Sequence, residues 1–357
     1  RTSIRRRTWG KAMPVSRWVN SFDASRAAPV ALVHLDEHDS QAQACDTLAA
    51  ATLTPKKIWP SYQDAALVYQ SNALELISSE ERLDAARNAE VAVVACMHNE
   101  MFMLPQFLAH YRRLGVDSFL IADNCSDDGT LEFLMEQPDV ALFSVDTDYS
   151  LSQYGAGWQQ AMMSAFRTGK WTLIADTDEL LVWQKNQTQS LPDLLKTPEF
   201  QGVDAARIFM LDMYPKASLG KATFKTNPFD EAGYTDRDPF LANWTGQGPF
   251  SNMPTWTSAV RHRLIAGSRT DLFVAQKIAL LKYQPWMRLS AGYHFLADVQ
   301  LSSRELIFGH FKYNADFHRK AQIEVSRRQH FNDAEEYRKY LALMSEGRDV
   351  IYQEGLS

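Results

Sequence analysis

The chain has 357 residues and a net charge of −6, and 45% of its residues are hydrophobic while 22% are charged. This globular composition excludes global disorder, and the acidic balance argues against a nucleic-acid partner, because phosphate binding needs clustered basic groups. Three cysteines, an odd number in a long chain, do not indicate a disulfide framework and favour a reducing compartment. No apolar run approaches the roughly 20 residues that span a bilayer. We expect a cytoplasmic protein with one large domain, or a medium domain with an appendage.

The first 88 residues are treated as an accessory amino-terminal segment. Its start is basic, since six Arg and Lys residues precede the first acid, Asp23. Such a start fits a solvated arm, a contact with anionic lipid or a protein partner, or a piece of a longer protein. Further on, "PVALVHL", an Ala-rich stretch at 42–50 and "PKKIW" are compatible with a degenerate strand-helix-strand unit.

A β-α unit begins at Val91. The short apolar run in "VAVVACMHNE" is typical of a strand buried on both faces of a parallel sheet. Apolar residues then recur at helical spacing from Leu104 to Leu114, with Pro105 near the start and Gly115 just past the end. The sequence therefore predicts a strand followed by a helix.

The same pattern repeats along the chain. "DSFLIADNCSDDGT" gives a strand, a polar turn and a helix, "VALFSV" gives a third strand, and a helix with Trp158 on its apolar face ends by Gly169. "WTLIAD" gives a fourth strand. Alternating strands and helices predict an α/β fold with a mostly parallel sheet, flanking helices and a ligand site beyond the carboxyl ends of the strands.

Polar residues follow three of these predicted strands. They are Asn99 and Glu100, Asp123 and Asn124, and Asp176, Asp178 and Glu179. Because the carboxyl ends of parallel strands meet at one edge, this arrangement argues against a mere charged turn in "LIADTDELLVW". Two aspartates one residue apart suit a hard cation such as Mg²⁺ or Mn²⁺, which is completed by water and substrate phosphates. A metal site for an anionic ligand is therefore predicted.

The segments "HNE", "DNCSDDGT" and "DTDE", in this order, resemble those of GT-A glycosyltransferases, in particular the family 2-like group with the Asp-x-Asp-Glu form and the related family 92. The resemblance covers about 91–183. It implies a Rossmann-like GT-A domain over 89–330, with a nucleotide-sugar half at 89–183 and an acceptor or lid half at 184–330. We expect 331–357 to form a carboxyl-terminal helix, with Asp333 as its cap.

The resemblance implies a role for each matching residue. Asn99, Glu100, Asp123 and Asn124 would line the nucleotide pocket, and Asp176 would reach the ribose or a metal-bound water. Asp178 would hold the metal together with Asp176. His98 stands where relatives usually have Arg.

The carboxyl-terminal half resembles the group more loosely. "TSAVRHRLIAG" is similar to a Gly-Gly-x-Arg-x-Arg segment and retains Arg261 and Arg263, while "KIALLKY", "AGYHFL" and "FGHFKYNADFHRK" supply Lys277, His294, His310 and Lys312. We expect His310 to complete the metal shell, and Lys312 and Arg261 to hold the donor diphosphate. His310 and Lys312 alternate, so an extended segment would turn both to one side.

An inverting transferase also needs a carboxylate that takes a proton from the acceptor hydroxyl. Asp236 and Asp238 are the candidates in the aromatic-rich stretch, and Glu179 is a third residue that would orient the metal ligands or face the acceptor. Taken together, the sequence predicts a transferase that uses Mn²⁺ or Mg²⁺ and a nucleotide-diphosphate sugar. By resemblance, its acceptor would be a glycan or a lipid-linked acceptor of bacterial surface polysaccharide synthesis, at or near the inner membrane.

Two other classes remain open. A GT-A-like module without turnover would act as a scaffold of a glycan-assembly complex. A haloacid dehalogenase-type phosphatase also has Asp-x-Asp after a strand, but that family has Thr or Val where this chain has Leu180. A sugar-phosphate nucleotidyltransferase needs a Gly-rich first loop, which "ACMHNE" lacks.

Overall fold

The computed structural model describes residues 74–244, 254–268, 273–284, 287, 289–296, 299–329 and 331–357, with two short strands at 5–6 and 57–58. Apart from those two strands, the basic start and the predicted strand-helix-strand unit lie outside the described residues.

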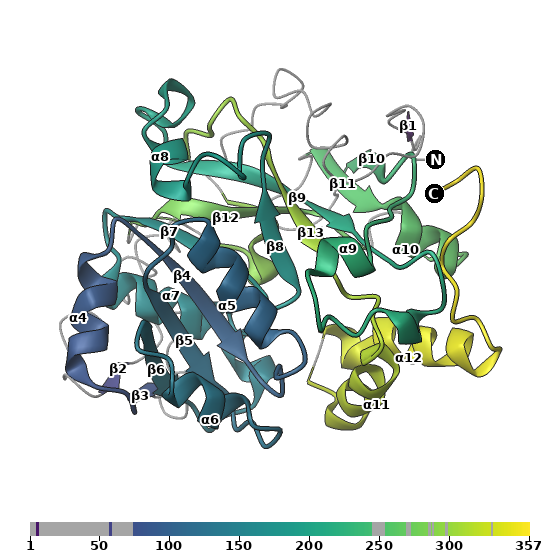
Figure 1. The fold of residues 1–357 in the computed structure, drawn as a ribbon, viewed down its shortest axis with the longest axis horizontal. Coiled ribbons are helices and arrows are strands. Elements are labelled where there is room, and N and C mark those ends of the chain that lie inside the picture. The colour runs from purple at the N-terminus through teal and green to yellow at the C-terminus, as the bar shows by residue number, and fades with distance from the viewer. Residues whose placement is uncertain are drawn as a thin grey trace.

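A ten-stranded sheet forms the centre of the molecule (Figure 1). In spatial order its strands are β2 (Lys57–Ile58), β3 (Leu74–Leu76), β6 (Val140–Ser144), β5 (Phe119–Asp123), β4 (Val91–Met97), β7 (Trp171–Ile174), β12 (Gln276–Lys282), β9 (Ala205–Asp212), β13 (Leu306–His310) and β8 (Glu179–Val182). A smaller antiparallel sheet consists of β1 (Arg5–Arg6), β10 (Phe240–Trp244) and β11 (Pro254–Ser258).

The large sheet is mostly parallel. Strands β6, β5, β4 and β7 form parallel pairs, and so do β9 and β13. Because β3, β12 and β8 are antiparallel to their neighbours, only these three run against the other seven of the ten described strands. The predicted α/β fold with a mostly parallel sheet is confirmed.

Helices flank the sheet in the alternation that the sequence predicts. They are α4 (Glu80–Asn88), α5 (Leu104–Arg113), α6 (Thr130–Met135), α7 (Ala156–Phe166), α8 (Leu191–Leu195), α9 (Pro228–Glu231), α10 (Ala259–Leu264), α11 (Phe317–Arg327) and α12 (Phe331–Ser345). Short 3-10 turns lie at Tyr149–Ser152, Pro198–Phe200, Leu219–Lys221 and Ala291–Tyr293.

The first β-α unit shows why these elements form. The strand β4 is buried from Val91 to Ala95, as a central strand must be. Helix α5 then buries Phe107 and Tyr111 against the sheet, and Gly115 leaves the helix with a positive φ of 84°. Both boundaries agree with the sequence prediction.

Two boundaries differ from the prediction. Strand β3 and helix α4 lie inside the expected accessory segment, yet β3 pairs with β6 in the main sheet and α4 packs on β6. The sheet therefore begins before residue 89. The predicted cap at Asp333 is wrong, because α12 already begins at Phe331 and includes Asp333.

Helix α5 also covers the free edge of the sheet. Among the described strands, β8 has a sheet neighbour on one side only, and α5 supplies hydrogen bonds to its other side. The Tyr111 hydroxyl donates to the Glu179 carbonyl at 2.6 Å and accepts from the Leu181 amide at 3.3 Å, and His110 Nε2 bonds the Leu181 carbonyl at 2.8 Å. These bonds fix β8, which carries Glu179 at its start.

The carboxyl-terminal helices lie beside the edge where β4 ends. Figure 1 shows α11 and α12, in yellow, next to that edge. Lys320 of α11 reaches Glu100, three residues beyond β4, with 2.7 Å between Nζ and Oε1. Residues far apart in the sequence therefore meet at this edge.

Candidate active site

The three predicted strand ends meet at one edge of the sheet. Met97 at the end of β4 is in register with Asp123 at the end of β5, and β7 runs parallel to β4 on its other side. Asp176 and Asp178 follow β7 directly. The chain order reverses between β4 and β7, which is where ligands bind in open α/β sheets.

The loop after β4 is tied to the loop after β5. Asn99 has a left-handed backbone (φ 56°), and its side chain exchanges two hydrogen bonds with Asp127, of 2.7 and 2.8 Å. The Glu100 amide donates to Thr130 Oγ1 at 2.9 Å, and His98 Nδ1 lies 2.6 Å from the Asn124 carbonyl. The side chain of Asn99 therefore shapes these loops.

The side chains of Asp123 and Asn124 differ in whether their hydrogen-bonding atoms already have partners. Asp123 is buried, and its Oδ2 accepts from the Ser126 amide at 3.1 Å, while Oδ1 has no hydrogen-bond partner among the described residues. The Asn124 amide donates to the carbonyls of Val145 and Thr147 at 3.1 and 2.9 Å. The Asn124 oxygen accepts from Arg327 Nη2 at 3.3 Å, so both ends of that side chain have partners, whereas Asp123 retains an acceptor.

Asp176 and Glu179 share one lysine. Lys277 is the second residue of the antiparallel strand β12, and its Nζ lies 2.7 Å from Asp176 Oδ2 and 2.6 Å from Glu179 Oε1. The other Glu179 oxygen accepts the Asp176 amide at 3.1 Å. Burial alone would lower the pKa of Lys277, but Asp176 and Glu179 outweigh it and raise that pKa. Glu179, 1% exposed, therefore braces Asp176 from within the protein.

Asp178 faces an imidazole. Its Oδ2 lies 3.5 Å from His310 Nε2, and its carbonyl accepts the Phe311 amide at 2.8 Å. Burial alone would raise the pKa of Asp178, but His310 and then Lys320 hold it well below its usual value. Burial alone would lower the pKa of His310, but Asp178 and Asp212 raise it to about 9.

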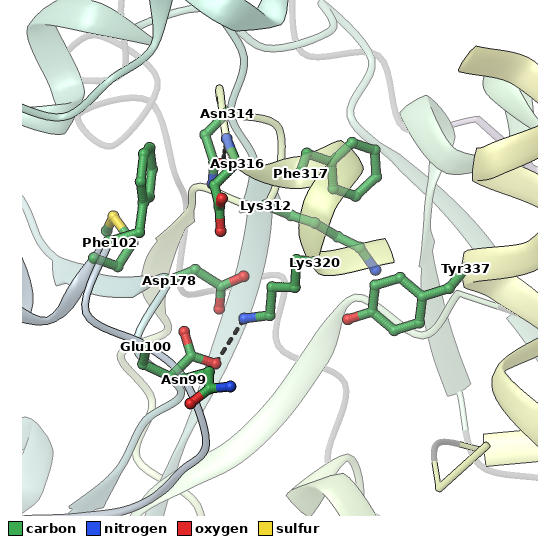
Figure 2. Close-up of a pocket in the computed structure, with 11 residues that line it drawn as sticks. Asn99, Glu100, Phe102, Asp178, Lys312, Asn314, Asp316, Phe317, Lys320 and Tyr337 are labelled. Carbon is green, nitrogen blue, oxygen red and sulfur yellow. Dashed lines mark hydrogen bonds and ion pairs between the residues drawn. The ribbon is translucent and has the colours of Figure 1, made fainter. Parts of the chain in front are cut away.

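A pocket opens in front of Asp178 (Figure 2). Strand-end loops line one side of it and the carboxyl-terminal segment lines the other, through Asn99, Glu100, Phe102, Met103, Asp178, Lys312, Asn314, Asp316, Phe317, Lys320 and Tyr337. Polar and charged side chains converge there beside a few aromatic ones, so the lining is more polar than that of most small-molecule pockets and suits a charged ligand.

Two lysines bring positive charge to this pocket. Lys312 Nζ lies 2.7 Å from Glu336 Oε1 and 4.8 Å from the centre of the Tyr337 ring. Lys320 Nζ lies 2.7 Å from Glu100 Oε1. Burial alone would raise the pKa of Glu336, but Lys312 and Arg261 lower it to about 2. Lys312 is among the residues that the sequence predicts for the site, whereas Lys320 and Glu336 are not.

The remaining predicted residues do not reach the pocket. Arg261 is buried and grips Asp212 with bonds of 3.0 and 2.9 Å, so it stands behind His310. Asp236 pairs with Arg263 at 2.7 Å. Within the described residues, neither Asp236 nor Asp238 lines the pocket, whereas Glu100 and Asp316 do.

The predicted set of three metal ligands is not gathered. No group of three or more His, Cys, Asp or Glu side chains among the described residues is arranged to hold a metal ion. Asp176 points to Lys277, which leaves Asp178 and His310. Their 3.5 Å separation is close to the ~3 Å between neighbouring ligands of an octahedral Mg²⁺. Since Mg²⁺ is often held by one or two carboxylates plus water and phosphates, Asp178 can supply such a ligand, and His310 Nε2 lies near enough to share an ion with it.

Comparisons with known proteins add little. No family model and no curated protein matches the chain. Among solved structures, a match titled "Crystal structure of 4-diphosphocytidyl-2C-methyl-D-erythritol synthase" has a TM-score of 0.25 and 13% identity, and covers 51% of this chain and 80% of that chain. A likeness this weak carries no argument about function. None of the described helices is both long and apolar enough to cross a membrane.

Proposed function

We propose that the chain is a metal-dependent glycosyltransferase that moves a sugar from a nucleotide-diphosphate donor to a hydroxyl of a glycan or lipid-linked acceptor, with inversion. The observation that carries the proposal is the position of Asp178. It belongs to an Asp-x-Asp-Glu motif at a strand end, faces His310 at 3.5 Å, and opens on a pocket that contains Lys312 and Lys320.

The donor nucleotide would lie over the ends of β4 and β5. Asp123 is an acceptor that still has an unbonded oxygen, which suits an N–H of a base or a ribose hydroxyl. Asp176 is 54% exposed while Lys277 braces it from behind, so its outer face suits a ribose hydroxyl. Asn99 and Asn124 would support the loops of this half.

The diphosphate would lie between Asp178 and the two lysines. Asp178 and His310 are the residues that would hold Mn²⁺ or Mg²⁺, and the ion would stabilise the negative charge that builds on the departing diphosphate. Lys312 and Lys320 provide fixed positive charge on the opposite wall.

The acceptor hydroxyl must lose a proton as it attacks, so the accepting carboxylate has to line the pocket. Asp236 is held by Arg263 and by the Tyr214 hydroxyl at 2.5 Å, outside the lining residues. Glu179 is buried against Lys277. We assign Glu179 to positioning Asp176, and Asp236 to a structural ion pair outside the site.

A panel of nucleotide sugars tests the proposal. With Mn²⁺ present, the purified protein should hydrolyse or transfer from one donor, and Asp178→Asn should lower kcat at least ~100-fold, because the interaction with the departing charge is lost. The matched control is Asp193→Asn, an exposed carboxylate on α8 that should leave turnover unchanged. Equal turnover by Asp178→Asn and wild type contradicts the assignment. Product of retained configuration, read by NMR, contradicts inversion alone.

A further inference from the structure

A buried carboxylate stands behind His310. Asp212 ends β9, and His310 ends the neighbouring parallel strand β13 in direct register with it. His310 Nδ1 lies 2.5 Å from Asp212 Oδ1. Asp212 is 3% exposed and was not singled out in the sequence.

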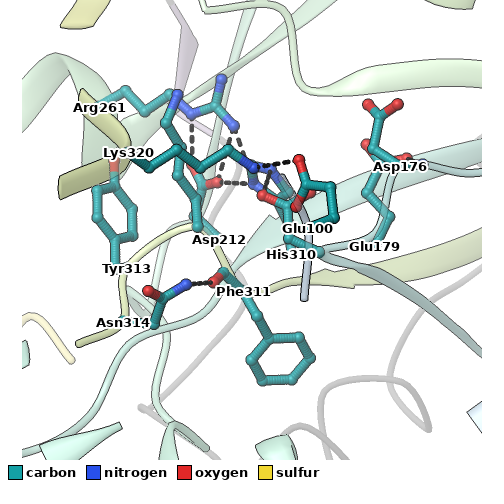
Figure 3. Close-up of polar contacts among 12 residues, drawn as sticks. Glu100, Asp176, Glu179, Asp212, Arg261, His310, Phe311, Tyr313, Asn314 and Lys320 are labelled. Atoms are coloured by element: carbon teal, nitrogen blue, oxygen red, sulfur yellow. Dashed lines mark hydrogen bonds and ion pairs between the residues drawn. The ribbon is translucent and has the colours of Figure 1, made fainter. Parts of the chain in front are cut away.

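Asp212 is itself held from the other side (Figure 3). Arg261 donates to both of its oxygens, through Nε at 3.0 Å and Nη2 at 2.9 Å, and the Ser258 hydroxyl donates to Oδ2. His310, Arg261 and Ser258, together with the position of Asp212 in the sheet, therefore fix the Asp212 carboxylate. The sheet gives it no freedom to turn toward solvent.

The contacts determine which imidazole nitrogen faces the pocket. An ionised carboxylate only accepts hydrogen bonds, so the 2.5 Å contact between Nδ1 and Asp212 Oδ1 requires a hydrogen on Nδ1, and Arg261, whose Nη2 lies 3.0 Å from Nδ1, cannot accept that hydrogen because a guanidinium only donates. The hydrogen on Nδ1 therefore goes to Asp212, and Nε2 is the nitrogen directed at Asp178.

We propose that Asp212 is a positioning residue that holds His310 with Nε2 turned toward Asp178, and thereby sets the affinity of this edge for a divalent cation. The proposal rests on the proposed function. It draws on the general behaviour of metal-binding histidines, whose second nitrogen is usually fixed by a carboxylate that also makes the ligand more basic.

The chain provides a matched control. Asp236 is also buried, also takes two bonds from an arginine, Arg263, at 3.1 and 2.7 Å, and accepts a hydroxyl from Tyr214. None of these bonds of Asp236 involves a histidine. Substituting Asp236 therefore reproduces the loss of a buried carboxylate–arginine pair without disturbing His310.

The experiment titrates Mn²⁺ alone into wild type, Asp212→Asn and Asp236→Asn, with free Mn²⁺ read by EPR and folding by circular dichroism. We expect Asp212→Asn to weaken Mn²⁺ binding about 10- to 100-fold. Asp236→Asn should change it by less than about twofold, whatever its thermal stability, and Asp212→Glu should recover part of the loss.

Equal Mn²⁺ affinity in wild type and Asp212→Asn overturns the proposal while leaving the proposed function intact, and so does an equal loss in Asp236→Asn. If Asp212→Asn does not fold, Asp212→Glu and Asp236→Glu take its place, and weaker binding in the first alone is then the supporting result. A wild-type protein that binds no Mn²⁺ overturns both this inference and the metal-dependent function.

Discussion

The two halves of the molecule meet in charged contacts at one site. Residues 91–182 supply carboxylates, Glu100, Asp123, Asp176 and Asp178, at successive strand ends. Residues 205–340 supply Lys277, His310 and Lys320, which lie 2.7 to 3.5 Å from Asp176, Asp178 and Glu100. The first half therefore carries the acidic motifs, while the second supplies cationic partners that neutralise part of their charge.

Breaking the Lys277 contact should have the largest effect on stability. Lys277→Met leaves buried Glu179 beside Asp176 with no cation, and removing one partner of a buried ion pair costs about 3–5 kcal/mol. Urea denaturation measures the loss. The double variant with Glu179→Gln should recover part of it. A decrease in unfolding free energy below about 1 kcal/mol in Lys277→Met would contradict a stabilising role for this contact between the two halves.

The attachment of α5 to β8 should depend on pH. Burial lowers the pKa of His110 to about 4, from 6.5 in the unfolded chain, and neighbouring Arg113 adds to this. Between these values the unfolded state binds more protons, so this residue's contribution to the free energy of unfolding falls as the pH drops from above 6.5 through 4.

His110→Gln should keep a donor to the Leu181 carbonyl but lose this dependence. The difference in unfolding free energy between wild type and variant should shift by as much as ~3 kcal/mol between pH 7 and pH 4. Urea denaturation at both pH values measures it. Parallel pH profiles for the two proteins would show that His110 is not a buried neutral imidazole.

The contact between Lys320 and Glu100 should matter for the ligand more than for stability. Both side chains are partly exposed, at 30% and 16%, so Lys320→Met should cost about 1 kcal/mol or less. Because Lys320 lines the pocket, we expect the KM for the donor to rise about tenfold, equivalent to ~1.4 kcal/mol.

Lys339→Met is the matched control, since Lys339 pairs with Glu335 at 2.6 Å along α12 and is not a pocket residue in the described part of the chain. The same change in KM for both variants would remove Lys320 from the site.

Asp236→Asn should have the smallest effect on chemistry. The Asp236–Arg263 pair belongs to the second half, and neither residue is among the described residues that line the pocket, so kcat should stay within about twofold of wild type at a temperature where the variant is folded. Steady-state kinetics with the active donor measures it. A loss of 100-fold or more would restore Asp236 as the proton acceptor.

The sequence was informative where strands end and uninformative where distant segments meet. Short continuous apolar runs, without the alternation of a half-exposed strand, predict β4, β5 and β7. The place of Asp123 and Asp178 at the carboxyl ends of strands therefore follows from chain order alone. The Asp212–His310 contact requires β9 and β13 to be neighbours, although 98 residues separate the two side chains. Nothing local in "FMLD" signals that pairing.

Lys320 shows the same difficulty on a helix. It stands in the quoted segment "FGHFKYNADFHRK", but its role depends on α11 packing beside the end of β4, 220 residues away from its partner. Arg261 was predicted to hold phosphate because of its motif. Its burial against Asp212 depends on the fold. The spacing of the motif does not tell whether the Arg261 side chain lies in a phosphate site or is buried behind it.

Pulsed EPR of Mn²⁺ bound to the protein with the nucleoside diphosphate of the active donor tests the central claim most directly. If Asp178 and His310 hold the cation that binds the diphosphate, one ion should show both ³¹P couplings and the coupling of a single imidazole nitrogen, and His310→Gln should remove only the nitrogen coupling. ³¹P couplings with no imidazole nitrogen in the wild type would contradict a cation site shared by the two halves.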